Sequence, residues 1–191
     1  MARDVVNKVS IETDKHQWNP SPLPGQVVLV TTLDDDGRAS DATKSWISMV
    51  AFGPPPVVMF GCNLGHATAR NVRASGEFVI NVPGVDLVAS CWALGSDASV
   101  PETDRLARYE LTTMASEAVR PPRIAECRAH IECELDGMKD WGQEVAIFGR
   151  IVAVSLDSRG ASDGLAAERA ERVVGAVGGG RALVLEVAGA A

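Results

Sequence analysis

Two short polar stretches carry the side chains best suited to bind an anion. Residues 43–45 read Thr-Lys-Ser and place two hydroxyls and a cation at the edge of an expected strand. An expected helix then opens near His66, and the free N–H groups and partial positive charge of a helix N-terminus favour an anion. His66, Thr68 and Arg70 can complete such a shell of donors. The combination predicts a phosphate-binding site.

Each residue also has a purely structural interpretation. Lys44 can be a solvated surface lysine, Thr68 can cap the helix, and Asn71 can bond to the backbone. For any one of these residues alone, the structural interpretation is the better one. Only their occurrence together favours a binding site.

The residues around these stretches predict strands, turns and one helix. Prolines between Trp18 and Gly25 exclude helix, so residues 1–25 are expected to form an extended arm. A helix is expected from Asn63 or Gly65 to about Ser75, closed by Gly76 in a left-handed cap. The expected strands cover 26–33, 43–52, 57–62 and 77–82, with a turn at 34–38 and a break at the prolines 54–56.

The second half of the sequence predicts three helices and three strands. Helices are expected over 86–94 and, more weakly, 102–109. Apolar and polar residues alternate from Arg128 to Leu135, which predicts a half-solvated strand, and a long strand over 145–156 should bend at Gly149. A helix over 162–176 is expected to end at three glycines, 178–180, which we interpret as a C-cap and turn before a last strand over 181–187.

Many short strands without regular βαβ alternation predict a mainly antiparallel β-barrel. We expect the arm to precede a single domain over residues 26–191. The net charge of −7 and the pI near 5.0 leave no basic stripe for a nucleic acid. The longest apolar runs are too short to span a bilayer and no signal peptide is evident, so a cytoplasmic protein without membrane contact is expected.

The four cysteines show neither a CxxC pair nor a spacing with the three histidines that would suit zinc. We expect reduced, buried thiols and no metal site. Cys62 differs from the others because it ends a strand beside the expected anion site.

The order of sequence blocks resembles flavoredoxin-like members of the flavin reductase family, over roughly residues 22–157. The similarity rests on the stretches 22–25, 28–32, 45–46, 50–52, 71–72, 76–78, 81–83, 122–126, 131–133 and 148–154. It implies an FMN-binding split β-barrel, Greek-key and antiparallel, with a few peripheral helices. It also implies a homodimer with the flavin near the subunit boundary.

The resemblance assigns cofactor-binding roles to matching residues. The segment that lines the flavin ring and ribityl chain corresponds to Ala42, Thr43, Lys44, Ser45 and Trp46. The phosphate side corresponds to Cys62, Asn63, His66, Ala67 and Thr68, with Arg70 nearby. No catalytic residue is expected, because flavin N5 takes a hydride from NADH or NADPH and passes electrons on. The acceptor can be free flavin, a monooxygenase partner or another redox protein, and FAD can replace FMN.

One departure from the family pattern leaves the activity open. Many relatives carry a histidine before the last long strand, whereas residues 140–144 here read Asp-Trp-Gly-Gln-Glu. Trp141 can cover the flavin face by stacking, or it can be a surface aromatic. A non-enzymatic FMN electron carrier therefore stays an alternative, as does a split barrel of the pyridoxamine phosphate oxidase-like or deazaflavin-using kind.

Overall fold

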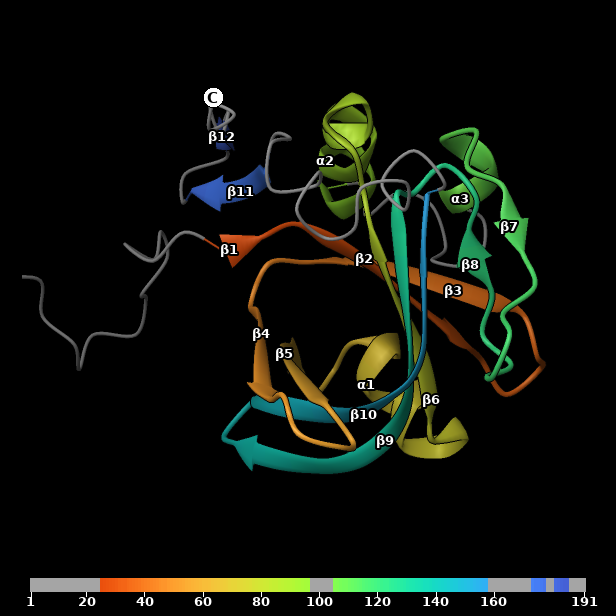
Figure 1. Ribbon diagram of the computed structural model, residues 1–191, viewed down its shortest axis with the longest axis vertical. Helices are drawn as coiled ribbons and strands as arrows, with labels where there is room; N and C mark the ends of the chain where they lie inside the picture. The colour runs from red at the N-terminus through yellow and green to blue at the C-terminus, as the bar shows by residue number, and fades with distance from the viewer. Residues whose placement is uncertain (1–24, 97–104, 158–172, 178–180, 186–191) are drawn as a thin grey trace, which may run out of the picture.

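The computed structural model describes residues 25–96, 105–157, 173–177 and 181–185 of the 191-residue chain (Figure 1). Residues 1–24 of the arm expected over residues 1–25, and the three glycines 178–180, lie outside these described residues. The described part is mainly antiparallel β, which confirms the expected fold class.

A seven-stranded antiparallel sheet forms the body of the molecule. Its strand order is β3-β2-β6-β9-β10-β5-β4. The bounds are β2 Val28–Leu33, β3 Ala39–Lys44, β4 Ile47–Ala51, β5 Val57–Asn63, β6 Glu77–Val82, β9 Ala129–Trp141 and β10 Glu144–Leu156. Figure 1 shows β9 and β10 curving around the helix α1 (Ala67–Ser75), which packs against β2, β3 and β5.

The two edge strands of this sheet are almost consecutive in sequence. Strands β3 and β4 lie at opposite ends of the strand order, yet only Ser45 and Trp46 separate them. The sheet must therefore be rolled so that its two edges approach, which is the closure of a barrel. The single strand predicted over 43–52 was thus wrong, because the chain leaves the β2 side at Lys44 and joins β5 from Ile47.

The bend in the long strands has a packing cause. The pairing of β9 with β10 shifts register between Phe148 and Gly149, so the bend predicted at Gly149 is confirmed. A Cβ at Gly149 would lie only 2.3 Å from the ring of Phe78, a buried core residue. Glycine therefore lets the curved sheet close tightly over its core.

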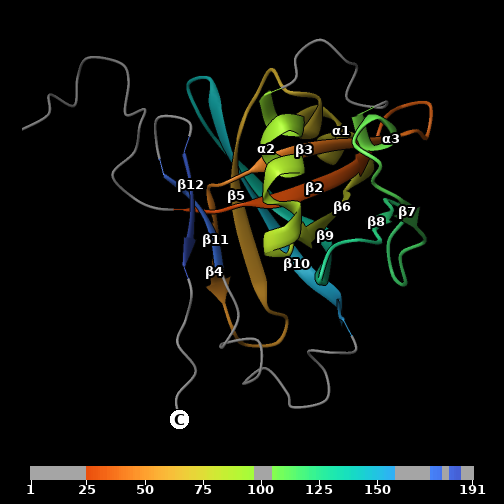
Figure 2. The ribbon, with the colours of Figure 1, turned by 90° about the horizontal axis from the view of Figure 1, so that it is seen from above.

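That core lies between α1 and the inner faces of the strands. Its buried members include Phe60 and Phe78, whose rings meet edge to face at 5.2 Å between centroids. A second apolar cluster lies under α2 (Val88–Ser96), which packs on β3 and follows the 3-10 turn η1 (Val85–Leu87). Figure 2 shows α2 lying over β2 and β3.

Smaller elements complete the described part. Helix α3 (Arg105–Arg108) is shorter than the helix predicted over 102–109, of which residues 102–104 lie outside the described part. Strands β7 (Thr113–Met114) and β8 (Arg123–Ile124) form a two-stranded sheet. Strand β1 (Gly25–Gln26) pairs with β11 (Val173–Val177), and β11 pairs with β12 (Arg181–Leu185).

Two expectations about the second half were wrong. Residues 173–177 form strand β11 and not the end of a helix, whereas residues 162–172 and the glycines 178–180 lie outside the described part. The strand from Arg128 is not half-solvated, because the segment that includes β7 and β8 covers its polar face. His130 and Glu132 are buried there and bond to that segment. No described helix is long and apolar enough to cross a membrane.

Candidate functional site

A pocket of about 310 Å³ opens where β3 passes into β4, and we call it the junction pocket. Its lining comes from the β3–β4 connection, the end of β5 and the turn before α1. The lining residues are Thr43, Lys44, Ser45, Trp46, Gly61, Cys62, Asn63, His66 and Glu144. Barrel closure therefore brings together the two polar stretches that the sequence singled out.

Lys44 is the main cation of the junction pocket. Its residue is only 8% exposed, so the solvated lysine of the structural interpretation is not what the fold contains. Lys44 forms no ion pair with a described residue. Because burying an unpaired charge is costly, a buried lysine at a pocket wall suits an anionic ligand.

Cys62 lies beside Lys44 in the same pocket. Burial raises the pKa of the Cys62 thiol, the nearby Lys44 ammonium opposes that rise, and the Glu144 carboxylate adds to it. The Cys62 Sγ also lies 3.4 Å from the Asn63 carbonyl oxygen. The thiol is thus protonated at neutral pH and acts as a weak donor in the pocket wall.

The residues between Lys44 and β4 shape the flat side of the pocket. The Trp46 ring lies over Gly61, where a Cβ would come within 3.0 Å of the ring. The Gly61 N–H donates to the Trp46 carbonyl at 2.7 Å, which fixes this contact. The Thr43 hydroxyl donates to the Cys91 carbonyl at 2.9 Å and so ties β3 to α2, leaving its oxygen only an acceptor toward the pocket.

The turn before α1 presents the helix N-terminus to the pocket. The helix begins at Ala67, later than Asn63 or Gly65, because Asn63 Oδ1 accepts the Gly65 N–H at 2.9 Å and holds a turn there. His66 is the N-cap residue and makes no side-chain cap. The N–H groups of Ala67 and Thr68 are therefore available to an anion, whereas the Ala69 N–H donates to the His66 carbonyl at 3.2 Å.

A second, larger hollow adjoins this helix start, and we call it the outer pocket. It measures about 550 Å³. Its lining residues are Asp34, Asp35, Asp36, Arg38, Ser40, Gly65, His66, Ala67, Arg70 and Asn71. The two pockets share His66.

The predicted site residues fall into three groups: those in the junction pocket, those in the outer pocket and those in neither pocket. The junction pocket gathers Thr43, Lys44, Ser45, Trp46, Cys62, Asn63 and His66, while Ala67 and Arg70 line the outer pocket. Three predicted residues line neither pocket: Ala42, Thr68 and Trp141. Ala42 is buried, and Thr68 is 1% exposed within α1 and does not cap the helix. Trp141 is exposed beside Lys139. Their roles in cofactor binding stay predictions.

Sequence reasoning missed Gly61 and Glu144. Glu144 opens β10, and its place opposite Asn63 follows from the pairing of β10 with β5. That register depends on the whole sheet, so no local signal marked the residue. Gly61 could have been suspected from its place in a strand, where glycine often marks a close approach.

Comparisons with known proteins identify the family of this chain. Residues 21–173 match the family model described as the flavin reductase like domain. The chain belongs to this family. Membership of this family supports a flavin-related oxidoreductase role for the chain.

Individual relatives agree with the family. An Archaeoglobus fulgidus protein is 29% identical over 115 residues, covering 59% of this chain and 63% of that protein. The reductase subunit HsaB of a flavin-dependent monooxygenase from Rhodococcus jostii is 26% identical over 129 residues, covering 68% of this chain and 62% of HsaB. This chain thus spans somewhat less than two thirds of the length of either relative.

A solved structure shows the same fold. The structure of nitrilotriacetate monooxygenase component B from Bacillus cereus has a TM-score of 0.81 and 21% identity, and it covers 96% of this chain and 98% of that chain. At this identity the likeness shows the split-barrel fold alone.

Proposed function

We propose that this chain binds FMN in the junction pocket and acts as an oxidoreductase that takes electrons from NADH or NADPH and delivers them to an acceptor. The observation that carries the proposal is the buried Lys44, which has no acidic partner among the described residues and faces a helix N-terminus without a side-chain cap. A phosphate group supplies the negative charge that both features favour.

The pocket residues fit the parts of FMN. Lys44 and the first-turn N–H groups of α1 would hold the phosphate, with the Ser45 hydroxyl as a further donor. Trp46 offers an apolar wall to a planar ring. When bound, FMN supplies the redox chemistry, by accepting a hydride and giving up electrons. The protein positions the flavin, limits its contact with water and sets the charge around it.

The direct test titrates the apo-protein with FMN while flavin fluorescence is followed. Lys44→Ala should weaken FMN binding by about 1–3 kcal/mol, because a charge-assisted bond to the phosphate is lost. Arg73→Ala is the matched control, since it removes a cation from the exposed last turn of α1, away from the pocket. Equal affinity of the wild type and Lys44→Ala would reject this placement of the phosphate, and no FMN binding at all would reject the function.

The proposal includes an electron acceptor outside the chain. HsaB is named as the reductase subunit of a monooxygenase, and component B belongs to a nitrilotriacetate monooxygenase. By analogy, a monooxygenase partner or free flavin is the acceptor we propose first. Oxygenase activity that appears only when the purified reductase is added to its partner would support this part of the proposal.

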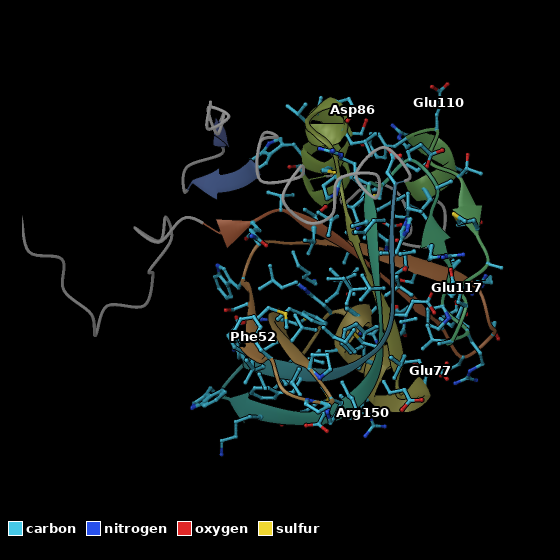
Figure 3. All side chains as sticks on the ribbon, in the orientation of Figure 1. Phe52, Glu77, Asp86, Glu110, Glu117 and Arg150 are labelled. Atoms are coloured by element: carbon cyan, nitrogen blue, oxygen red, sulfur yellow. The ribbon has the colours of Figure 1, made fainter. Side chains whose placement is uncertain are left out.

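A homodimer is also part of the proposal. The edge strand β4 and the residues beside it expose large apolar side chains, with Trp46 at 57%, Val50 at 52% and Phe52 at 87%. Figure 3 labels Phe52 near this edge. Apolar side chains gathered on one sheet edge favour burial against a partner. We propose that a second copy covers this edge, next to the junction pocket. Light scattering of the wild type should give twice the monomer mass. The Val50→Lys variant should give a lower mass, closer to that of the monomer.

The electron carrier is the second candidate, and one observation favours it. The turn at residues 141–144 contains no histidine, and Trp141 there is exposed and contacts neither pocket. Stopped-flow mixing of the FMN-loaded protein with NADH and NADPH separates the two functions. Rapid bleaching of the flavin supports the reductase, and unchanged absorbance supports the carrier.

A further inference from the structure

The two chain neighbours of Lys44 are both in close contact with glycines that lie outside the candidate site. Thr43 and Ser45 line the junction pocket together with Lys44, where β3 passes into the connection to β4. Gly25 meets Ser45 and Gly95 meets Thr43, and neither glycine lines the junction pocket or the outer pocket. The backbone that carries Lys44 is thus held on both sides by contacts made outside the site.

Gly25 brings strand β1 against the backbone of Ser45. A Cβ at Gly25 would lie 1.9 Å from the Ser45 carbonyl oxygen and 2.9 Å from its carbonyl carbon. No side chain fits there unless one of the two backbones moves, so this approach requires glycine. Figure 1 shows β1 beside the connection from β3 to β4. Gly25 also pairs with Ala176 of β11, so the position of β1 is set by a sheet separate from the seven-stranded one.

Gly95 makes the second contact from the last turn of α2. A Cβ at Gly95 would lie 3.0 Å from the Cβ of Thr43 and 3.1 Å from its hydroxyl oxygen. Gly95 has no positive φ that would call for glycine, and alanine is the better helix former, so close packing is the reason for glycine here. The Thr43 hydroxyl also donates to the Cys91 carbonyl of the same helix. Helix α2 therefore holds Thr43 by packing and by a hydrogen bond.

These contacts matter because a charge-assisted hydrogen bond depends on where its donor is held. A displacement of a binding group by about 1 Å can cost about a hundredfold in function. We propose, on the basis of the proposed FMN site, that Gly25 and Gly95 are positioning residues, which let β1 and α2 pack directly on the residues after and before Lys44 and so hold its ammonium where the phosphate binds. A larger residue at either position displaces this segment while every side chain of the pocket stays the same.

The test compares Gly25→Ala and Gly95→Ala with the control Gly137→Ala, whose added Cβ would meet no atom within 4 Å. Gly137 lies in β9 and lines neither pocket. FMN affinity is measured by fluorescence titration, and folding by circular dichroism and thermal unfolding. Gly25→Ala should weaken FMN binding about tenfold and Gly95→Ala about threefold, in the order of their contact distances, whereas Gly137→Ala should stay within about twofold of the wild type.

A second measurement reports on Lys44 without any flavin. Lys44 lowers the pKa of the Cys62 thiol against the effect of burial, so a displaced Lys44 should move the alkylation of Cys62 by iodoacetamide to higher pH in the apo-protein. Gly25→Ala and Gly95→Ala should both show this shift, and Gly137→Ala should not. A general loss of packing would instead make all four buried cysteines react faster.

Gly95→Ala separates positioning from a loss of stability. Alanine favours the helix, so this variant should unfold near the temperature of the wild type while its FMN affinity falls. It also carries the test alone if Gly25→Ala does not fold.

The outcomes distinguish this inference from the function on which it rests. If the wild type binds FMN and the two variants match Gly137→Ala in FMN affinity and in the Cys62 profile, the positioning role is wrong and the FMN site stands. If the wild type does not bind FMN, the proposed function fails, and the Cys62 profile then decides whether the two glycines position Lys44.

Discussion

Asn63 and Glu144 join the turn before α1 to the start of β10, because Asn63 Nδ2 donates to Glu144 Oε1 at 3.3 Å. A second bond supports the same junction, from the Leu64 N–H to the Gln143 carbonyl at 2.8 Å. Asn63 Oδ1 meanwhile holds the Gly65 N–H. Both ends of this amide are thus used within the protein, so Asn63 positions the helix start and has little capacity left for a cofactor.

Glu144 therefore has two opposing effects on an anion in the junction pocket. Its hydrogen bond holds the loop in place, and its negative charge repels the ligand. Glu144→Gln keeps an acceptor for Asn63 and removes the charge, so FMN should bind about threefold more tightly. Glu144→Ala removes both, so its affinity should be lower than that of Glu144→Gln. Fluorescence titration of the pair measures the difference, and equal affinities would show that the Asn63 bond does not matter for binding.

The contact between Lys44 and Cys62 predicts a change in thiol reactivity. Lys44 lowers the pKa of Cys62 against the effect of burial, so Lys44→Met, which keeps the apolar stem, should raise that pKa further. The thiolate is the reactive form, so alkylation of Cys62 by iodoacetamide should move to higher pH in the variant. Peptide mapping by mass spectrometry follows each cysteine separately.

Cys91 is the internal control for this measurement. Burial raises the pKa of Cys91 to about 11, and Lys44 is not among the groups that affect it. Its alkylation should be equally slow in both proteins. A Cys62 profile that stayed at the same pH in Lys44→Met would mean that the lysine does not stabilise the thiolate.

Much of the fold was predictable because the signals are local. Strands β2, β5, β6 and β12 and helix α1 follow from apolar runs bounded by turn residues, and the left-handed Gly76 after α1, with φ of 72°, ends the helix as expected. The bend at Gly149 was predictable because glycine within an apolar strand favours it. These features need only the neighbouring residues.

The missed features depend on partners distant in sequence. The alternation from Arg128 predicts a solvated face, but Glu132 bonds to backbone N–H groups of residues 117–119, which no local pattern reveals. In the same way, the helix predicted up to residue 176 was wrong at its end, because residues 175 and 176 pair with β1, which lies far away in the sequence. The polar stretches of the candidate site were found from residue types, whereas Glu144 was missed because only the strand register brings it there.

The turn between β2 and β3 should make stability depend on acid pH. Asp34 accepts the Arg38 N–H at 2.8 Å, the Arg38 Nε–H at 3.1 Å and the Asp36 N–H at 3.0 Å. The Arg38 backbone bond is the largest cause that holds the pKa of Asp34 below its ordinary value of 3.8. A lowered folded pKa stabilises the fold above the unfolded pKa, and this stabilisation is lost as the pH falls through the folded value.

Unfolding of the wild type and Asp34→Ala should therefore be compared between about pH 7 and pH 2. The wild type should be the more stable protein at neutral pH, and the difference should shrink once the pH falls below the ordinary value of 3.8. Asp35→Ala, one residue along the same turn, is the matched control, because it removes a carboxylate that has no hydrogen-bond donor among the described residues. A constant difference for Asp34→Ala down to the lowest pH would contradict the role of the turn.

The most stabilising side-chain interaction in the described part should be that of Glu132. Its carboxylate is 1% exposed and accepts N–H groups from Glu117 at 2.9 Å, Ala118 at 2.6 Å and Val119 at 3.3 Å, with Arg123 Nε at 3.8 Å. Glu132→Ala leaves these buried N–H donors without an acceptor, although Arg123 keeps its ion pair with Glu117 at 2.7 Å, so the free energy of unfolding should fall by about 3–5 kcal/mol.

Two other variants calibrate this loss. Glu134 lies two residues beyond Glu132 on β9, and its half-exposed carboxylate pairs with Arg150. Glu134→Ala should lower the free energy of unfolding by only about 0–1 kcal/mol. Glu132→Gln keeps an acceptor oxygen but loses the charge, so it should fall between the other two. Urea unfolding followed by circular dichroism measures all three, and a Glu132→Ala protein as stable as Glu134→Ala would show that water replaces the carboxylate beneath the 117–119 segment.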